Sequence, residues 1–196
     1  MRPFVRSQVE GRSAEARFAR IGRGYGWRVE EASKHDDMRR HIDVYIAREE
    51  RRLSVDIKAR KRVRRGDDNA CDEWWWLERT NVQGRRGWLH GEADVIAFET
   101  PRGFELLERD KLAAWADTAV DWERRVSSPG LAHYRCYTRF GRRDEVTLVK
   151  AGECLRAALL ETWVEPRPPS CSPPKEAPQK EEQDQPAVEP ISHPCK

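Results

Sequence analysis

Three charged residues in the first third of the sequence have types and positions that suit the hydrolysis of a phosphodiester. They are Asp43, Asp56 and Lys58. Metal ions held by carboxylates activate water and stabilise charge on phosphate, and Mg²⁺ needs few protein ligands because it keeps several waters. An ammonium group beside two carboxylates can orient the attacking water or offset phosphate charge. The three residues are therefore candidates for a catalytic site that uses Mg²⁺ or Mn²⁺.

Two short strands would bring these side chains together. In residues 41–47 and again in residues 53–59, apolar side chains occupy every second position. Successive side chains of a strand point to opposite faces, so the three charged residues would share one polar face, opposite the core. Because only residues 48–52 separate the runs, the sequence predicts an antiparallel hairpin. The apolar positions are Ile42, Val44, Ile46, Leu53, Val55 and Ile57.

A helix over residues 7–23 is predicted before this hairpin, because Ala14, Phe18 and Ile21 form an apolar stripe at helical spacing. Glu15 lies beside that stripe, where it could turn toward the acids. The order of the elements indicates an α/β domain over residues 1–164, with a mixed central β-sheet flanked by helices. The other predicted elements are strands over 27–30, 74–80 and 93–100, helices over 109–122 and 152–163, and a hairpin of 134–140 with 145–150.

A run of basic residues follows Lys58 directly. Six of the eight residues from Lys58 to Arg65 are basic, although the net charge of the chain is only +3. Concentrated positive charge favours a polyanionic partner, because neutralised phosphates release condensed counterions; a solvated loop is the alternative. A second basic loop, Gln83–Gly87, suits phosphate contacts and a plain exposed turn equally well. The candidate nucleic-acid-binding residues are Arg60, Lys61, Arg62, Arg64, Arg65, Arg85 and Arg86.

Two further groups of residues have a structural and a functional interpretation. Trp74–Trp76 and Trp88 could stack on unpaired bases, but aromatic residues in strands more often pack in a core, and packing is favoured here. Glu92 and Asp94 form a second pair of carboxylates on one strand face. They could line the same cleft or face solvent, and they rank below Asp43 and Asp56.

The cysteines and the hydropathy pattern exclude several classes of protein. Five scattered cysteines without a CxxC pair predict neither a disulfide framework nor a zinc site, since His133 and Cys136 lack a second pair of ligands. The N-terminus lacks the apolar stretch of a signal peptide, and no apolar run approaches the ~18 residues that span a bilayer. We expect a reducing cytoplasm and no contact with a membrane.

The last part of the sequence, residues 165–196, differs in composition from the rest. Nine of the twelve prolines follow Glu165, whereas none of the eight tryptophans does, and acidic residues outnumber basic ones there. Such a segment cannot bury enough apolar surface to offset the entropy of ordering it. The sequence therefore predicts a disordered, Pro-rich acidic tail, either a tether for another protein or a solvated end.

The candidate site resembles that of the PD-(D/E)xK nucleases, particularly archaeal Holliday-junction resolvases and related phage endonucleases. Their pattern is Gly-x-x-x-Glu on a first helix, then glycine, an Asp strand and an (Asp/Glu)-x-Lys strand. Here the matching segments are Gly11–Glu15, the glycines at 24 and 26, Ile42–Asp43 and Asp56–Lys58. The likeness covers roughly residues 11–60, and Ile42 replaces the usual proline. The Trp74–Trp76 strand and the loop Gln83–Gly91 have no counterpart, which leaves the substrate open.

This resemblance implies a restriction-endonuclease-like fold and a role for each matching residue. Asp43 and Asp56 would be metal ligands with the backbone carbonyl of Ile57, Lys58 would position the water, and Glu15 would be an accessory linked to metal or water. The implied activity is a Mg²⁺- or Mn²⁺-dependent DNA endonuclease in a bacterium or a phage-infected cell, for which selectivity for branched DNA or a role in phage DNA processing is one option. A homodimer is also implied, because two symmetrical cuts need two sites. The alternatives are a nucleic-acid-binding module on the same fold that does not cut, and an RNA-directed version of either.

Overall fold

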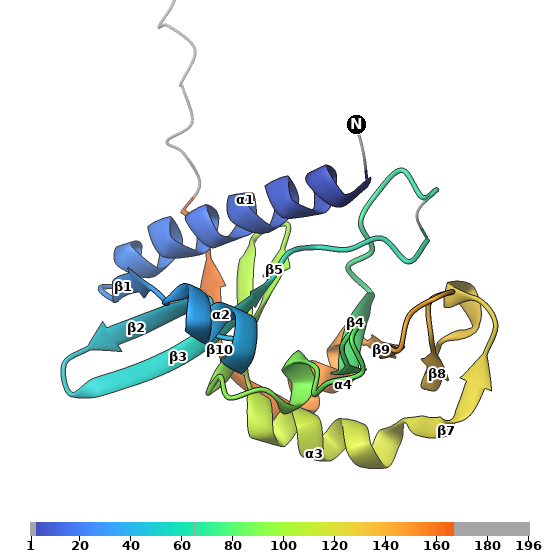
Figure 1. Cartoon of the computed structure of the whole chain (residues 1–196). Helices are drawn as coiled ribbons and strands as arrows, with labels where there is room; N and C mark the ends of the chain where they lie inside the picture. The colour runs from blue at the N-terminus through green and yellow to red at the C-terminus, as the bar shows by residue number, and fades with distance from the viewer. Residues whose placement is uncertain (1–2, 65, 167–196) are drawn as a thin grey trace, which may run out of the picture. The chain divides into compact units, whose positions relative to one another are not determined.

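The computed structural model describes residues 3–64 and 66–166, and side chains from residue 11 onward. Arg65 and nearly all of the predicted tail therefore lie outside the described residues. The chain begins with α1 (Pro3–Gly24) and is an α/β protein with two mixed sheets flanked by helices (Figure 1). Among the helices described, none combines the length and the apolar character needed to cross a bilayer.

The larger sheet has six strands and holds the predicted hairpin. β3 pairs antiparallel with β2 and parallel with β5, so β3 has a neighbour on both sides. The other neighbouring strands of this sheet pair antiparallel. Its strands, in order across the sheet, are β1 (Arg28–Glu31), β2 (Val44–Arg48), β3 (Arg51–Lys58), β5 (Val95–Thr100), β6 (Gly103–Glu108) and β10 (Leu159–Val164).

The smaller sheet has four strands that come from two separate segments of the chain. One segment contributes only β4, which pairs antiparallel with β9, and the other contributes the remaining three strands. β7 and β8 pair parallel, so this sheet is mixed as well. In order across the sheet the strands are β4 (Trp74–Thr80), β9 (Glu145–Lys150), β8 (Arg135–Tyr137) and β7 (Asp121–Val126).

Two apolar clusters hold these layers together. The first lies where α1 crosses one face of the six-stranded sheet (Figure 1), and it includes the predicted stripe Ala14, Phe18 and Ile21. Gly22 permits this close approach, because a Cβ there would lie 2.8 Å from the ring of Trp163. The second cluster joins the other face of that sheet to β4, β9, α3 (Arg109–Ala119) and α4 (Ala151–Ala158).

Most of the predicted elements are present, and the two predicted helices that end early lie in the C-terminal half. The helix predicted over 152–163 is wrong in its second part, because α4 ends at Ala158 and β10 follows at once. Leu159 has extended dihedral angles (φ −57°, ψ 125°), and pairing with β6 buries Trp163 against α1. The helix predicted over 109–122 likewise ends early, since Trp122 belongs to β7. α2 (Lys34–Arg40), β6 and β7 were not predicted.

Candidate active site

The carboxylate of Asp43 is fixed at the start of β2 by contacts with β3. Its backbone N–H donates to the carbonyl of Val55 at 2.9 Å, and its Oδ2 accepts a hydrogen bond from the backbone N–H of Ile57 at 2.6 Å. The carbonyl of Asp43 accepts in turn from the N–H of Ala32. The side chain therefore points toward the next strand, at the position that lies between Asp56 and Lys58 in the sequence.

The carboxylate of Asp56 is buried and only half satisfied. Its Oδ1 lies 2.6 Å from Nζ of Lys58, and the residue is 2 % exposed. Its Oδ2 has no hydrogen-bond partner within the part of the chain that the structure describes. A buried acceptor without a partner is costly, by about 1–3 kcal/mol. An oxygen in this state is available to a ligand that enters the site.

The prediction of an exposed polar face on β3 is wrong. Ser54 and Asp56 are both buried, although they alternate with apolar residues as expected. The reason is that β3 lies inside the sheet, and that the second apolar cluster, with Trp88 and Ile96, lies on the side of the sheet opposite α1. The alternation of the sequence is correct, but it separates two covered faces rather than a core from solvent.

Burial dominates the electrostatics of Asp56. It raises the pKa of this carboxyl to about 8, against the lowering effect of the Lys58 ammonium, and the nearby charge of Asp43 raises it further. The two aspartates therefore compete with each other for negative charge. Placing two acids and one base at such close range is typical of sites where protons or cations bind.

The ammonium group of Lys58 is held between the acid and an aromatic ring. Its Nζ lies 4.9 Å from the centre of the Trp88 ring, in a cation–π contact, while the side chain is 24 % exposed. Trp88 belongs to the 3-10 turn η1 (Trp88–His90) and is itself buried. Lys58 can thus reach solvent, but the ring and Asp56 restrict its orientation.

Two further carboxylates, one on each of the helices α1 and α2, lie near enough to Asp43 for its charge to act on their pKa. On α1, partial burial raises the pKa of Glu15, and the charges of Asp43 and Asp37 raise it further, although the residue as a whole is exposed. On α2, burial and then Asp43 raise the pKa of Asp37, whereas Lys58 lowers it. The structure therefore brings the predicted Glu15 to the site and adds Asp37. A signal for Asp37 did exist, since Ser33 caps α2 by accepting from the N–H of Asp36.

His41 lies at the end of α2, close to the same charges. Its backbone is left-handed (φ 56°) and caps the helix. Burial lowers the pKa of the imidazole, and the positive charge of Lys58 lowers it again. Its Nε2 lies 3.3 Å from the carbonyl oxygen of Arg86, which connects the site to the loop that precedes Trp88.

The donor set suits a hard divalent cation with few protein ligands. Among residues 3–64 and 66–166, no group of three or more His, Cys, Asp or Glu side chains is arranged to hold a metal ion. Two carboxylates, Asp43 and Asp56, and the predicted carbonyl of Ile57 are the available oxygens. Such a set fits Mg²⁺ or Mn²⁺, which complete their coordination with water, and the unpartnered Oδ2 of Asp56 is a free ligand atom.

The basic run after β3 folds back on itself as a loop over residues 60–72. The guanidinium of Arg60 makes two hydrogen bonds to Asp72, at 2.6 and 2.7 Å, and Cys71 N–H donates to the carbonyl of Lys61. Arg60 is therefore committed to closing the loop, which weakens its candidacy as a phosphate contact. Lys61 and Arg64 are exposed on this loop, Arg62 is partly buried, and Arg65 lies outside the described residues.

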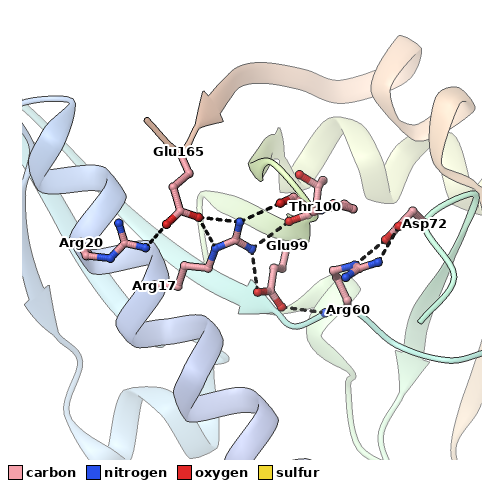
Figure 2. A network of polar contacts seen from close by, with 8 residues as sticks. Arg17, Arg20, Arg60, Asp72, Glu99, Thr100 and Glu165 are labelled. Carbon is pink, nitrogen blue, oxygen red and sulfur yellow. Dashed lines mark hydrogen bonds and ion pairs between the residues drawn. The ribbon is translucent and has the colours of Figure 1, made fainter. Parts of the chain in front are cut away.

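A network centred on Arg17 supports the point where the chain leaves β3 (Figure 2). Arg17 bonds to Glu99, to Glu165 and to the carbonyls of Thr100 and Pro101 at 2.8–3.2 Å. The second oxygen of Glu99 accepts the backbone N–H of Arg60. α1 is thus tied to the end of β5 and to the start of the loop, and the sequence offered no signal for this arrangement.

The remaining candidates have structural roles or lie on the surface. Trp75 is buried and stacks on Phe98, with ring centres 4.1 Å apart, so the prediction of packing is confirmed for this residue. Glu92 pairs with Arg40, and Asp94 accepts from the N–H and the hydroxyl of Ser54, so these acids do not join Asp43. Arg85 and Arg86 are exposed in the loop before η1.

The candidate site is thus assembled from α1, α2, β2 and β3, with Trp88 of η1 against its lysine. Its acids are separated by up to forty-one positions in the sequence, from Glu15 to Asp56. A scan against protein-family models, a search of curated proteins and a search of solved structures found no match to this chain. Any activity must therefore be inferred from the chemistry of these side chains.

Proposed function

We propose that this protein is a metal-dependent endonuclease of the PD-(D/E)xK type that hydrolyses DNA phosphodiesters with Mg²⁺ or Mn²⁺. The observation that carries the proposal is the arrangement of Asp43, Asp56 and Lys58. They lie on neighbouring strands, Asp43 bonds to the residue between the other two, and one oxygen of Asp56 is buried without a partner among the described residues. A buried carboxylate with a purely structural role would be expected to have both oxygens satisfied.

The contrast with Asp94 supports this interpretation. Asp94 also accepts a backbone N–H of β3, that of Ser54, but the same oxygen of its carboxylate takes the Ser54 hydroxyl as well, in a closed local pair. Asp56 instead pairs with Lys58, and the charge of Asp43 acts on the pKa of Asp56 and of the acids on two helices. Concentrating negative charge in this way destabilises the protein unless a cation binds there.

Each residue of the site has a role that its position allows. A divalent cation held by Asp43, Asp56 and the carbonyl of Ile57 would supply Lewis-acid chemistry at the scissile phosphate. Lys58 carries a positive charge next to the buried acid, so its ammonium can orient the attacking water and offset the charge of the phosphate. Glu15, whose pKa is raised, is suited to accept a proton from that water directly or through a second one.

The fold is consistent with the proposal. In a restriction-endonuclease-like arrangement the acids and the lysine lie on a hairpin within a mixed sheet, with a helix packed against it. Here β2 and β3 form that hairpin, and β5 adds a parallel neighbour to β3. Helix α1 packs on the face of the sheet that lies away from Trp88. The four-stranded sheet is additional to this arrangement.

A nicking assay tests the proposal directly. The full chain, incubated with supercoiled plasmid and with branched DNA, should convert them to nicked or cut products with Mg²⁺ or Mn²⁺ and not with EDTA. Lys58→Ala should lower the rate at least ~1,000-fold while DNA affinity stays within about threefold. Lys111→Ala, which changes an exposed lysine on α3, is the matched control. Equal activity in wild type and Lys58→Ala would indicate a contaminating nuclease and favour the non-cutting binding module.

A further inference from the structure

Two arginine-rich turns that are far apart in the sequence lie side by side at one end of the four-stranded sheet. They are residues 81–87 and residues 139–144, which we call the arginine turns. They meet because β4 and β9 pair antiparallel with Thr80 opposite Glu145, so the chain leaves β4 where it enters β9. Arg143 N–H donates to the carbonyl of Val82 at 3.4 Å, and the Arg143 side chain packs on Gly84.

Within the described part of the chain, acidic side chains leave most of the charge on this surface unpaired. Four arginines are exposed there, and none of them has an ion pair with a carboxylate of the described chain. The only acid within the two turns is Asp144, which is fully buried and binds Arg139. The four arginines are Arg85, Arg86, Arg142 and Arg143. Unbalanced arginines on adjacent turns suit a phosphate backbone, since each guanidinium can donate two hydrogen bonds to one phosphate.

Phe140 projects from the same surface. It is 104 % exposed, the highest value among the large apolar residues described, whereas the next is Met38 at 64 %. A phenylalanine left in water gives up the favourable free energy of burying its ring. The turn is nevertheless well braced, because the N–H of Arg139 donates to Asp144 and the N–H of Arg142 donates to the carbonyl of Arg139. The ring is therefore held outward by a closed turn.

The arginine turns are connected to the candidate active site by two routes. The carbonyl of Arg86 contacts His41, and Trp88, one residue beyond the first turn, lies under the Lys58 ammonium. Glu78 lies 3.9 Å from Arg139 of the second turn; burial raises its pKa, while the charges of Lys58 and then Arg139 lower it. A strand bound across the turns would thus continue toward Lys58.

We propose that the arginine turns bind the backbone of DNA and that Phe140 stacks on an unpaired base, so that the substrate is a duplex interrupted by unpaired bases. Arginines alone would fit any duplex, but an outward ring beside them matches the exposed face of a base that is not stacked in a helix. This inference rests on the proposed function for its reaction, and on the turns alone for its recognition of DNA.

Binding measurements on uncut DNA test the recognition. Wild type in EDTA and the Lys58→Ala chain with Mg²⁺ should bind a duplex with an internal bubble more tightly than the fully paired duplex. Phe140→Ala should weaken binding to the bubble by about 5-fold to 100-fold, which corresponds to the loss of one stacked base. Its affinity for paired DNA should stay within about twofold, and Phe140→Trp should restore the preference. Leu159→Ala, which removes an exposed apolar side chain from the other sheet, is the control.

A spectroscopic signal separates stacking from simple proximity. A 2-aminopurine placed in the bubble should be quenched when wild type or Phe140→Trp binds, and not when Phe140→Ala binds. Arg142→Ser should weaken binding to bubble and paired DNA alike, whereas Arg102→Ser, in the exposed β5–β6 turn, should change neither.

Three results would overturn the inference. They are an equal effect of Phe140→Ala on both DNAs, no effect on either, or Phe140-dependent binding to anionic vesicles without any preference for the bubble. Failure of the proposed function has a different signature, because the protein would then prefer the bubble through Phe140 and yet cut no DNA with any divalent cation.

Discussion

The two sheets of this protein carry their charged residues in opposite ways. In the six-stranded sheet the two candidate metal ligands are held within the sheet: Asp56 is buried, and Asp43 is bonded to the backbone of β3. In the four-stranded sheet they are at the tips of turns, where arginines and Phe140 are exposed and only the bracing Asp144 is buried. Burial makes an acid sensitive to one neighbouring cation, whereas exposure lets a basic side chain adapt to a long polyanion. In our proposals the chemistry therefore belongs to one sheet and the recognition of DNA to the other.

The largest effect is expected from Asp43→Asn. The amide oxygen can still accept the N–H of Ile57, so the fold should persist, but one negative charge is lost from the site. We expect the cleavage rate to fall at least ~1,000-fold and DNA affinity to change less than about threefold. Asp94→Asn makes the same chemical change at a carboxylate whose hydrogen bonds, among the described residues, all go to Ser54, and it should keep the rate within about threefold. Loss of DNA affinity without loss of rate in Asp43→Asn would contradict the division between sheets.

The second effect concerns recognition. Replacing Arg85, Arg86, Arg142 and Arg143 together by serine should weaken DNA binding by about 10-fold to 100-fold at low salt. The slope of log affinity against log salt should become less steep by about 0.9 for each phosphate that the protein no longer neutralises. The rate at saturating DNA should stay near that of wild type. An unchanged slope would place the DNA elsewhere, for example on Lys61 and Arg64 of the loop after β3.

The third effect is on the stability of the fold alone, and it concerns a network that ties α1 to the six-stranded sheet. Arg17→Met removes charge-assisted bonds to Glu99 and to the carbonyl of Thr100, both partly buried, and an exposed bond to the carbonyl of Pro101 (Figure 2). We expect a loss of about 2 kcal/mol in the free energy of unfolding, measured by urea denaturation. Arg20→Met is the control, since Arg20 is 59 % exposed and bonds only Glu165 among the described residues. Similar stabilities of the two variants would mean that Glu165 alone accounts for the contribution of the network.

The smallest effect is expected at Glu78, which contacts Arg139 of the second arginine turn and feels the charge of Lys58. Because burial raises its pKa in the folded chain, stability is lost as the pH rises through that pKa, and none is lost below the unfolded value of about 4.5. Glu78→Gln should therefore melt about 1–3 °C above wild type at pH 8, and the difference should disappear near pH 4. Glu123→Gln, at an exposed position on β7, should show no such pH dependence. A gap that widens toward low pH would reverse the sign and contradict this explanation.

The N-terminal half of the fold, apart from α2, could be predicted because its signals are local. The stripe of α1 and the alternation around Asp43 and Asp56 are properties of a few adjacent residues. β10 could not be predicted, because Leu159 follows a helix without a glycine or proline and its extended conformation depends on pairing with β6. The burial of Asp56 was missed for a related reason, since it follows from the residues that cover β3 and not from β3 itself.

The same distinction applies to the residues of the site. Asp43, Asp56, Lys58 and Glu15 could be chosen from their spacing, and their catalytic roles remain predictions. Asp37 was missed because its short helix is set by one capping serine. The pairing of Arg60 with Asp72 and the meeting of the two arginine turns depend on contacts between distant segments, which no local pattern encodes.

The four-stranded sheet is built from two excursions of the chain, one between β3 and β5 and one between α3 and α4. Both leave the six-stranded sheet and return to it without interrupting the β2–β3 hairpin. If the proposed functions hold, different turns at 81–87 and 139–144 would change the bound target and leave the candidate active site as it is. The excursions could not be deleted, because Trp75 of β4 stacks on Phe98 of β5. Deleting β4 would expose that part of the larger sheet to solvent.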